Sequence, residues 1–297
     1  MIDPVSFLAD RRVAIIGLGL MGGSLALALR GRVAELLAAD PDPETRQLAL
    51  ERRIVDQIVA DPVEIIPRVD VIILAAPVRA ILSHIHLLGD VVSHPQKMVD
   101  AQQPVSPIVL DLGSTKREIV EAMKTLPQNF DPLGGHPMCG KETSGLAFAE
   151  AEIFRGATFA FTPLERTSRR AHIFAEALAN AVGAVPLWID PATHDRWVAV
   201  TSHLPYLLAN ALAGVTPNEA APLIGPGFRS TSRLAPASLS IMLDILRTNR
   251  QPVLEALQRF QTQVGEIEKY LAESNFGELS RLLADGARRR QSLVQPQ

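Results

Sequence analysis

The residue best suited to act as a base is His136, in the segment Gly134-Gly135-His136-Pro137. Two glycines before it and a proline after it predict a constrained loop, not a helix face. Imidazole has an unperturbed pKa of about 6.5, so a positioned histidine can accept a proton from a reacting hydroxyl near neutral pH. We therefore expect His136 to be a general base. The alternative is a histidine that only braces the loop.

Three more polar residues could contribute chemistry. Ser114 follows an apolar run and could cap the next helix, which does not exclude a second role near a substrate. His203 precedes Pro205 in a helix-like stretch, where proline should produce a kink of the kind that often borders a site. Arg233 follows a glycine-rich segment and could bind a carboxylate through a bidentate pair. For His203 and Arg233, a purely structural polar contact explains the pattern equally well.

A glycine-rich loop indicates a cofactor site. It follows the apolar run 13–16 and precedes a helix-like stretch, and that context makes the G-x-G-x-x-G pattern specific. In such loops the glycines allow a tight turn, close approach of a pyrophosphate and close helix–strand packing, and the helix N-terminus faces the phosphates. The residues expected to bind a dinucleotide here are Gly17, Leu18, Gly19, Leu20, Met21 and Gly22.

Two further strand ends belong to the same predicted site. Asp40 ends the second apolar run, where a carboxylate can accept hydrogen bonds from the adenosine ribose and repel a 2′-phosphate. The next cation is Arg46, so we favour NAD over NADP; the alternative is a turn residue before Pro41. Ala76 and Pro77 end the third run and should lie near the nicotinamide half, because ligands of such sheets bind at the carboxyl ends of strands.

The elements that carry these residues alternate in the first half of the chain and become helical in the second. Short apolar runs predict buried strands at 13–16, 36–39, 71–75, 108–112 and 158–162, with 185–189 as a further candidate. Helix-like stretches cover 21–30, 43–53 and 115–125, then 169–182, 191–213, 237–248 and 252–273. The fold class is therefore α/β: a Rossmann-type doubly wound parallel sheet followed by an all-helical domain. We place the NAD-binding domain at 1–165, with 184–190 able to join its sheet, and the helical substrate and dimerisation domain at 166–297.

The last helix-like stretch carries apolar residues at alternating spacings of four and three, which is typical of a coiled-coil seam. A helix packed on its own domain and a helix in a dimer interface both fit this pattern. The seam residues are Val253, Leu257, Phe260, Val264, Ile267 and Leu271.

Composition limits the partners and the compartment. A net charge of −3 over 297 residues argues against nucleic acid and against anionic membranes, and the longest apolar runs are too short to cross a bilayer. A single cysteine, Cys139, with no signal peptide at the start, fits the reducing cytoplasm. No pattern predicts a metal site.

Several segments, taken in order, form a pattern over nearly the whole chain. They are the loop at 17–22, Gly113-Ser114-Thr115-Lys116, 134–138 with 140–145, Ser202-His203-Leu204-Pro205, Gly227-Phe228-Arg229 and Thr231-Ser232-Arg233. With these segments the chain resembles the prephenate/arogenate dehydrogenase family of tyrosine biosynthesis. The family often has an acidic residue where Ser230 stands here. Because the matching segments use the full length, neither a mutase domain nor a regulatory domain is expected in addition.

The resemblance implies an oxidative decarboxylation in which hydride leaves C4 of a cyclohexadienol for the nicotinamide, carbon dioxide leaves C1 and the ring becomes aromatic. It implies that His136 accepts the hydroxyl proton and that Ser114 hydrogen-bonds the same hydroxyl. Arg233 would bind a carboxylate and His203 would contact the side chain of the substrate. A homodimer through the C-terminal helices is also implied.

The substrate and the class of protein leave alternatives open. We favour prephenate, with 4-hydroxyphenylpyruvate as product, over arogenate, with tyrosine as product; Glu142 is an acidic neighbour that would suit the arogenate ammonium. A β-hydroxyacid dehydrogenase would need a lysine on a helix of the second domain, and none occurs between Lys141 and Lys269. A non-catalytic NAD(H)-sensing protein would keep the loop without a base or a carboxylate clamp.

Overall fold

The computed structural model describes residues 4–93, 106–141 and 143–294. By its internal contacts the chain divides into two compact units, Met1–Asn249 and Arg250–Gln297. The larger unit holds the sheet and every candidate site residue, so it is described first.

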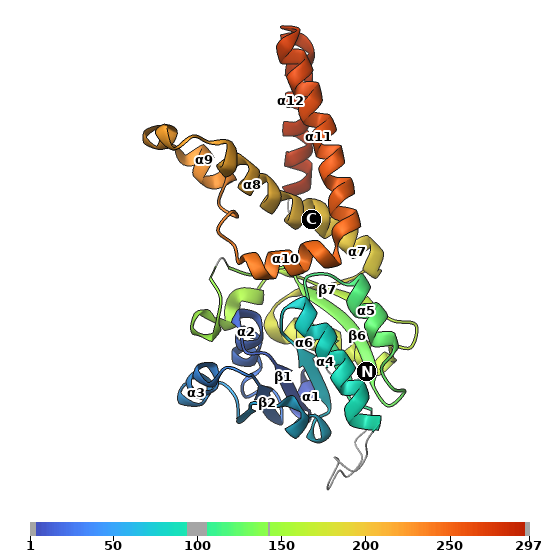
Figure 1. Ribbon diagram of the computed structural model, residues 1–297. Helices are drawn as coiled ribbons and strands as arrows, with labels where there is room; N and C mark the ends of the chain where they lie inside the picture. Colours follow the sequence, from blue (N-terminus) through green and yellow to red (C-terminus); the bar gives the residue numbers. More distant parts are fainter. Residues whose placement is uncertain (1–3, 94–105, 142, 295–297) are drawn as a thin grey trace. The chain divides into compact units, whose positions relative to one another are not determined.

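One eight-stranded sheet organises the larger unit, in the order β3-β2-β1-β4-β5-β6-β7-β8. Helices surround this sheet (Figure 1). Neighbouring strands run parallel except β6 and β7, which are antiparallel. The described residues of the link between these two strands, 138–141 and 143–157, form short 3₁₀ turns and no crossover helix, and parallel strands need such a crossover. The strands are β1 Arg12–Ile16, β2 Glu35–Ala39, β3 Gln57–Val59, β4 Val71–Leu74, β5 Ile108–Asp111, β6 Asp131–Pro137, β7 Thr158–Pro163 and β8 Val185–Trp188.

Helices cover both faces of the sheet, which is why its inner strands are apolar on both sides. Val13 and Ile15 of β1 pack in one core with residues of α1, α2, α3 and α6, whereas Ala14 and Ile16 pack in a second core with residues of α4 and α5. The two cores fix the carboxyl ends of the strands, where the candidate site lies. These helices are α1 Pro4–Ala9, α2 Leu20–Leu29, α3 Pro43–Glu51, α4 Val78–Ser93, α5 Arg117–Lys124 and α6 Arg169–Val182.

The mostly parallel sheet, the helical C-terminal part and the addition of β8 to the sheet confirm the predicted fold class. The reversed strand β7 is the exception to the parallel arrangement. The prediction of a loop at His136 was wrong, because this residue lies in β6 and pairs with Ala160 of β7. Glycine, proline and aspartate are rare in strands, and they make up five of the seven residues of Asp131–Pro137. The local sequence therefore did not predict this strand.

The helical part of the larger unit begins with an almost continuous helix interrupted by one π-helical segment. α7 spans Pro191–Val198, the π segment spans Ala199–His203 and α8 spans Leu204–Val215. The predicted kink at Pro205 is replaced by this widened turn, in which the Leu204 amide donates to the Ala199 carbonyl five residues back. Short helix α9, Pro226–Thr231, and helix α10, Leu239–Thr248, follow.

By length and hydropathy alone, the combined segment Pro191–Val215 is long and apolar enough to cross a bilayer. It nevertheless carries three buried polar side chains, His194, Asp195 and His203, that contact other parts of the larger unit. That pattern is typical of a core helix in a folded domain.

The smaller unit consists of two helices, α11 Arg250–Ala272 and α12 Phe276–Val294, which pack against each other after a short turn. Phe260, Val264 and Leu271 of the predicted seam are 36%, 44% and 52% exposed in the single chain. This unit therefore leaves apolar surface of α11 uncovered.

Candidate functional site

The glycine-rich loop has the geometry expected of a dinucleotide cradle. Gly17 has φ of +96°, and a Cβ there would lie 2.8 Å from the Ala75 carbonyl oxygen. A Cβ on Gly22 would lie 1.9 Å from the Gly17 carbonyl oxygen, so α2 packs directly against the turn. At Gly19 a Cβ would meet no atom within 4 Å. The open side of the loop at Gly19 is thus the place where a pyrophosphate can approach.

Asp40 is fixed at the rim of this loop. Its carboxylate accepts hydrogen bonds from the Leu18 amide at 2.8 Å and from the Asp42 amide at 3.0 Å. The Arg46 guanidinium lies beside it and donates to the main-chain carbonyls of Asp40 and Pro41, each at 2.8 Å. A cation therefore contacts the main chain of the predicted ribose-binding residue.

The first turn of α2 adds to the cradle. Leu20, Met21 and Gly22 form that turn, and its N-cap, Gly19, gives no side-chain hydrogen bond to the helix. An uncapped N-terminus presents N–H groups and a partial positive charge, which suits a phosphate. The loop, Asp40 and this helix end fit a dinucleotide.

The end of β4 leads into a pocket of about 290 Å³. Ala76 is partly exposed and Pro77 is exposed, and both precede α4 at the carboxyl edge of the sheet. Pro77 and Arg79 line one side of the pocket, and Asp244 and Arg247 of α10 are among the residues that line the other. Helix α10 therefore borders the edge of the sheet at which a ligand is expected.

A buried ion pair lies behind His136. The side chains of Asp111, at the end of β5, and Lys116 are both fully buried and form an ion pair. Lys116 also donates to the Gly135 carbonyl oxygen, and the Gly135 amide donates to Asp111 at 3.2 Å. Burial lowers the pKa of Lys116 and raises that of Asp111, while their pairing acts in the opposite direction. The pair joins the Ser114 segment to the strand that carries His136.

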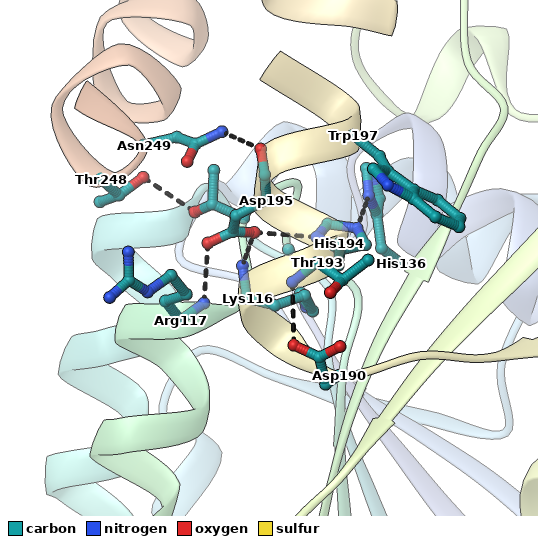
Figure 2. A network of polar contacts seen from close by, with 12 residues as sticks. Lys116, Arg117, His136, Asp190, Thr193, His194, Asp195, Trp197, Thr248 and Asn249 are labelled. Atoms are coloured by element: carbon teal, nitrogen blue, oxygen red, sulfur yellow. Dashed lines mark hydrogen bonds and ion pairs between the residues drawn. The ribbon is translucent and has the colours of Figure 1, made fainter. Parts of the chain in front are cut away.

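Asp195 of α7 caps helix α5 from a distant part of the chain. Its carboxylate accepts from the Lys116 amide at 2.7 Å and from the Arg117 amide at 2.9 Å (Figure 2). A carboxylate at a helix N-terminus satisfies free N–H groups and the helix dipole. Ser114, the predicted cap, does not hold the N-cap position, which belongs to Lys116. Ser114 is half-buried two residues before that position.

The same carboxylate begins a chain of two imidazoles. Asp195 Oδ1 lies 2.8 Å from His194 Nδ1, and His194 Nε2 lies 2.9 Å from His136 Nδ1. Figure 2 shows the two rings pointing toward each other from α7 and β6. Burial, and then the charges of His194, Lys116 and His203, hold the pKa of His136 well below its ordinary value of 6.5. His136 is therefore neutral near pH 7 and able to accept a proton.

His203 joins this network through Asn249. The Asn249 amide nitrogen lies 2.8 Å from the Asp195 carbonyl oxygen and 3.1 Å from His203 Nδ1. His203 and Asn249 are each 1% exposed, and burial lowers the pKa of His203 to about 4. A further contact of 2.8 Å joins the hydroxyls of Thr115 and Thr248. The end of α10 is thus tied to the Ser114 segment and to α7.

The structure brings His136, the Ser114 segment and His203 into one region, whereas Arg233 is exposed in the segment that follows α9. Sequence reasoning did not single out the residues that connect this region. The adjacent pair His194-Asp195 near a helix start was a usable signal, because neighbouring ionisable residues on an otherwise apolar helix suggest a buried network. Asn249 gave no such signal. Glu142, the possible ammonium partner, lies outside the described residues.

Comparison with protein families gives two matches that together span most of the chain. The family described as "Prephenate dehydrogenase, nucleotide-binding domain" matches residues 25–186. The family described as "Prephenate dehydrogenase, dimerization domain" matches residues 190–285. The first match alone covers more than half of the chain.

Relatives in other bacteria are similar over most of this chain and over about three quarters of their own length. A prephenate dehydrogenase of Bacillus subtilis is 27% identical over 279 residues, 91% of this chain and 72% of the relative. One of Lactococcus lactis is 29% identical over 293 residues, 95% of this chain and 77% of the relative. An arogenate dehydrogenase structure from Synechocystis has 28% identity and a TM-score of 0.78, covering 95% of this chain and 100% of that one.

A prephenate dehydrogenase structure from Aquifex aeolicus, in complex with hydroxyphenyl propionate and NAD⁺, gives a TM-score of 0.85 at 24% identity. It covers 96% of this chain and 99% of that one. At this identity the likeness shows that the fold is shared.

Proposed function

This chain belongs to the prephenate dehydrogenase family, and we propose that it catalyses the NAD-dependent oxidative decarboxylation of prephenate to 4-hydroxyphenylpyruvate. The observation that carries the proposal is the position of His136. This neutral imidazole lies on β6 next to the carboxyl ends of the parallel strands, where a nicotinamide bound at the glycine loop would be directed.

In the proposed reaction the protein mainly aligns the substrate and removes one proton. His136 accepts the proton of the 4-hydroxyl, and Ser114 hydrogen-bonds the oxygen of the same hydroxyl. Arg233 binds a carboxylate and His203 contacts the side chain of the substrate. The hydride from C4 goes to the bound NAD⁺, and the electron pair of the broken C1–carboxylate bond completes the aromatic ring as carbon dioxide leaves.

The cofactor assignment rests on the loop and on Asp40. Residues 17–22 would hold the pyrophosphate, Asp40 would accept from the ribose hydroxyls, and Ala76 and Pro77 would border the nicotinamide half. A 2′-phosphate would meet the Asp40 carboxylate. Arg46 already binds two carbonyls there, which reduces its value as a phosphate partner. NAD is therefore the cofactor we propose, as in the A. aeolicus complex.

The chain is proposed to act as a homodimer in the cytoplasm. The C-terminal part matches a dimerization domain, and the exposed apolar residues of α11 support a seam between two copies. A boundary near residue 165 between an NAD-binding domain and a substrate domain also stays a proposal. Beyond this boundary, β8 still belongs to the sheet and α6 still packs on it.

The decisive experiment offers prephenate and arogenate in turn, each with NAD⁺ and NADP⁺, and follows reduced nicotinamide and carbon dioxide. We expect turnover with prephenate and NAD⁺ to give the highest kcat/KM. A higher kcat/KM with arogenate would reassign the substrate within the family. NADH binding without turnover of either substrate would favour a non-catalytic NAD(H)-sensing protein and overturn the proposal.

A further inference from the structure

We infer that Asp195 is a positioning residue that sets the two site histidines in opposite neutral tautomers, with the proton on Nδ1 of His136 and on Nε2 of His203. For neutral rings, the tautomers follow from the hydrogen-bond contacts. Their consequence for substrate choice rests on the proposed function. A hydrogen-bond chain from the Asp195 carboxylate sets His136, and one from the Asp195 main-chain carbonyl sets His203.

The chain from the carboxylate determines His136. The carboxylate already accepts from two backbone amides, and an ionised carboxylate only accepts, so His194 must donate to it from Nδ1. A neutral imidazole has one donor and one acceptor, which leaves His194 Nε2 as an acceptor. His136 Nδ1 faces that acceptor at 2.9 Å and must carry the proton. The lone pair of His136 is therefore on Nε2.

The chain from the carbonyl determines His203. A carbonyl oxygen only accepts, so the atom of Asn249 that lies 2.8 Å from the Asp195 oxygen must be the amide nitrogen. The same nitrogen faces His203 Nδ1 at 3.1 Å as a donor. His203 Nδ1 is then the acceptor and Nε2 carries the proton. The low pKa of His203, about 4, keeps this ring neutral.

Opposite tautomers give the two histidines opposite tasks. His136 offers a lone pair and can take the hydroxyl proton. His203 offers an N–H group to the substrate side chain, which favours a keto oxygen and disfavours an ammonium at the same place, because two donors then face each other. The site would therefore select a keto acid over the corresponding amino acid.

Nuclear magnetic resonance of the full-length protein, with its histidines labelled with ¹⁵N, tests the tautomers without any substrate. The protonated nitrogen of each ring is distinguished by its shift and its couplings, and signals are assigned by their loss in His136→Gln and His203→Gln. We expect His136 in the Nδ1–H form and His203 in the Nε2–H form. The reverse form of either ring in the wild-type protein overturns the inference, whatever the protein catalyses.

A matched pair of variants tests the His194 link. In His194→Asn the amide can still donate to Asp195 but does not reach His136. In His194→Gln the amide oxygen reaches the position of Nε2 and can accept from His136 Nδ1. We expect kcat to fall about tenfold to a hundredfold in the first variant and much less in the second, with NADH affinity unchanged in both, because a misplaced tautomer impairs only the proton transfer. Equal losses in both variants would mean that His194 is merely structural.

Asn249→Asp tests the second link. A carboxylate facing His203 Nδ1 reverses the tautomer, so we expect the ratio of kcat/KM for prephenate to that for arogenate to fall at least about tenfold, or about 1.4 kcal/mol. Asn249→Leu, which has a similar size and no donor, releases the constraint and serves if the charged variant does not fold. An unchanged ratio in the folded variants contradicts the selection of keto acids. Absence of turnover in the wild-type protein, with the tautomers as stated, would instead overturn only the proposed function.

Discussion

The glycine loop and the polar cluster around His136 are built in different ways. The loop is one short segment, and its shape comes from backbone conformation at Gly17 and from close backbone packing at Gly22. The cluster joins side chains from the ends of β5 and α10, from β6, and from α7 with the turn after it. A site made from backbone tolerates changes of side chain around it, whereas a site made from side chains depends on each partner. The following predictions test this difference.

The largest effect is expected at His136. In His136→Asn the proton acceptor is lost, so kcat should fall about 10²- to 10⁴-fold, the range usual for a general base. NADH affinity, measured by fluorescence titration, should remain, because the loop lies in a different segment. A variant with near-normal turnover would remove His136 from this role.

The next effect concerns stability. Lys116→Met leaves the Asp111 carboxylate buried without its partner, and we expect the free energy of unfolding to fall by about 3–5 kcal/mol in urea titration. Lys124→Met breaks the exposed ion pair with Glu121 and should change little. The double variant Asp111→Asn/Lys116→Met should recover part of the loss, since no unpaired charge remains. Equal stability of Lys116→Met and the wild-type protein would show that the cluster does not depend on this pair.

Arg233 tests how far the side-chain site extends. Arg233→Ala should raise KM for the substrate about tenfold to a hundredfold with little change in kcat, because a charge-assisted bond to a carboxylate contributes about 1.5–3 kcal/mol. Steady-state kinetics at saturating NAD⁺ measure this. An unchanged KM would place the carboxylate clamp on another residue.

Within the loop, two alanine variants should separate folding from cofactor binding. Gly19→Ala introduces a Cβ that meets no protein atom, so we expect unchanged thermal stability and an NADH affinity about tenfold weaker. Gly22→Ala places a Cβ 1.9 Å from the Gly17 carbonyl oxygen and should lower the thermal midpoint as well. If both variants lose the same stability, the backbone account of the loop is wrong.

A further effect is a dependence of stability on pH. The folded-state pKa values of His136 and His203 are lowered, the latter to about 4, so the unfolded chain binds more protons than the folded protein below their ordinary value of 6.5. Stability should therefore be constant above pH 6.5 and fall as the pH decreases toward 4. Burial lowers the pKa of both rings. The charges of His194, Lys116 and His203 lower the pKa of His136 further, whereas Asp195 raises that of His203. Urea midpoints at several pH values measure the effect, and His203→Gln should reduce it.

The same difference explains what could be predicted from sequence. The loop, its flanking strand and helix, and Asp40 are close in sequence and follow local rules, so their geometry was predictable. The role of His136 as a general base stays a prediction. Strand β6 was not predicted, because Gly134, Gly135 and Pro137 are unusual in a strand and its pairing partners β5 and β7 lie elsewhere in the chain. His194, Asp195 and Asn249 acquire their roles from contacts across 46 to 79 positions of the chain, which no local pattern encodes.

The π-helical segment Ala199–His203 changes the angular positions, around the helix axis, of the residues that follow it. Asp195 and His203 are eight positions apart, and at about 100° per residue a regular α-helix would turn their side chains roughly 80° away from each other. A π turn absorbs one extra residue, so the two behave as if seven positions apart, a separation of about 20°. Asn249 contacts the main-chain carbonyl of Asp195 and the side chain of His203 across this turn. Removing a single residue from this turn would straighten the helix and change the angular register of everything beyond it, so residues 199–202 should tolerate substitution far better than deletion.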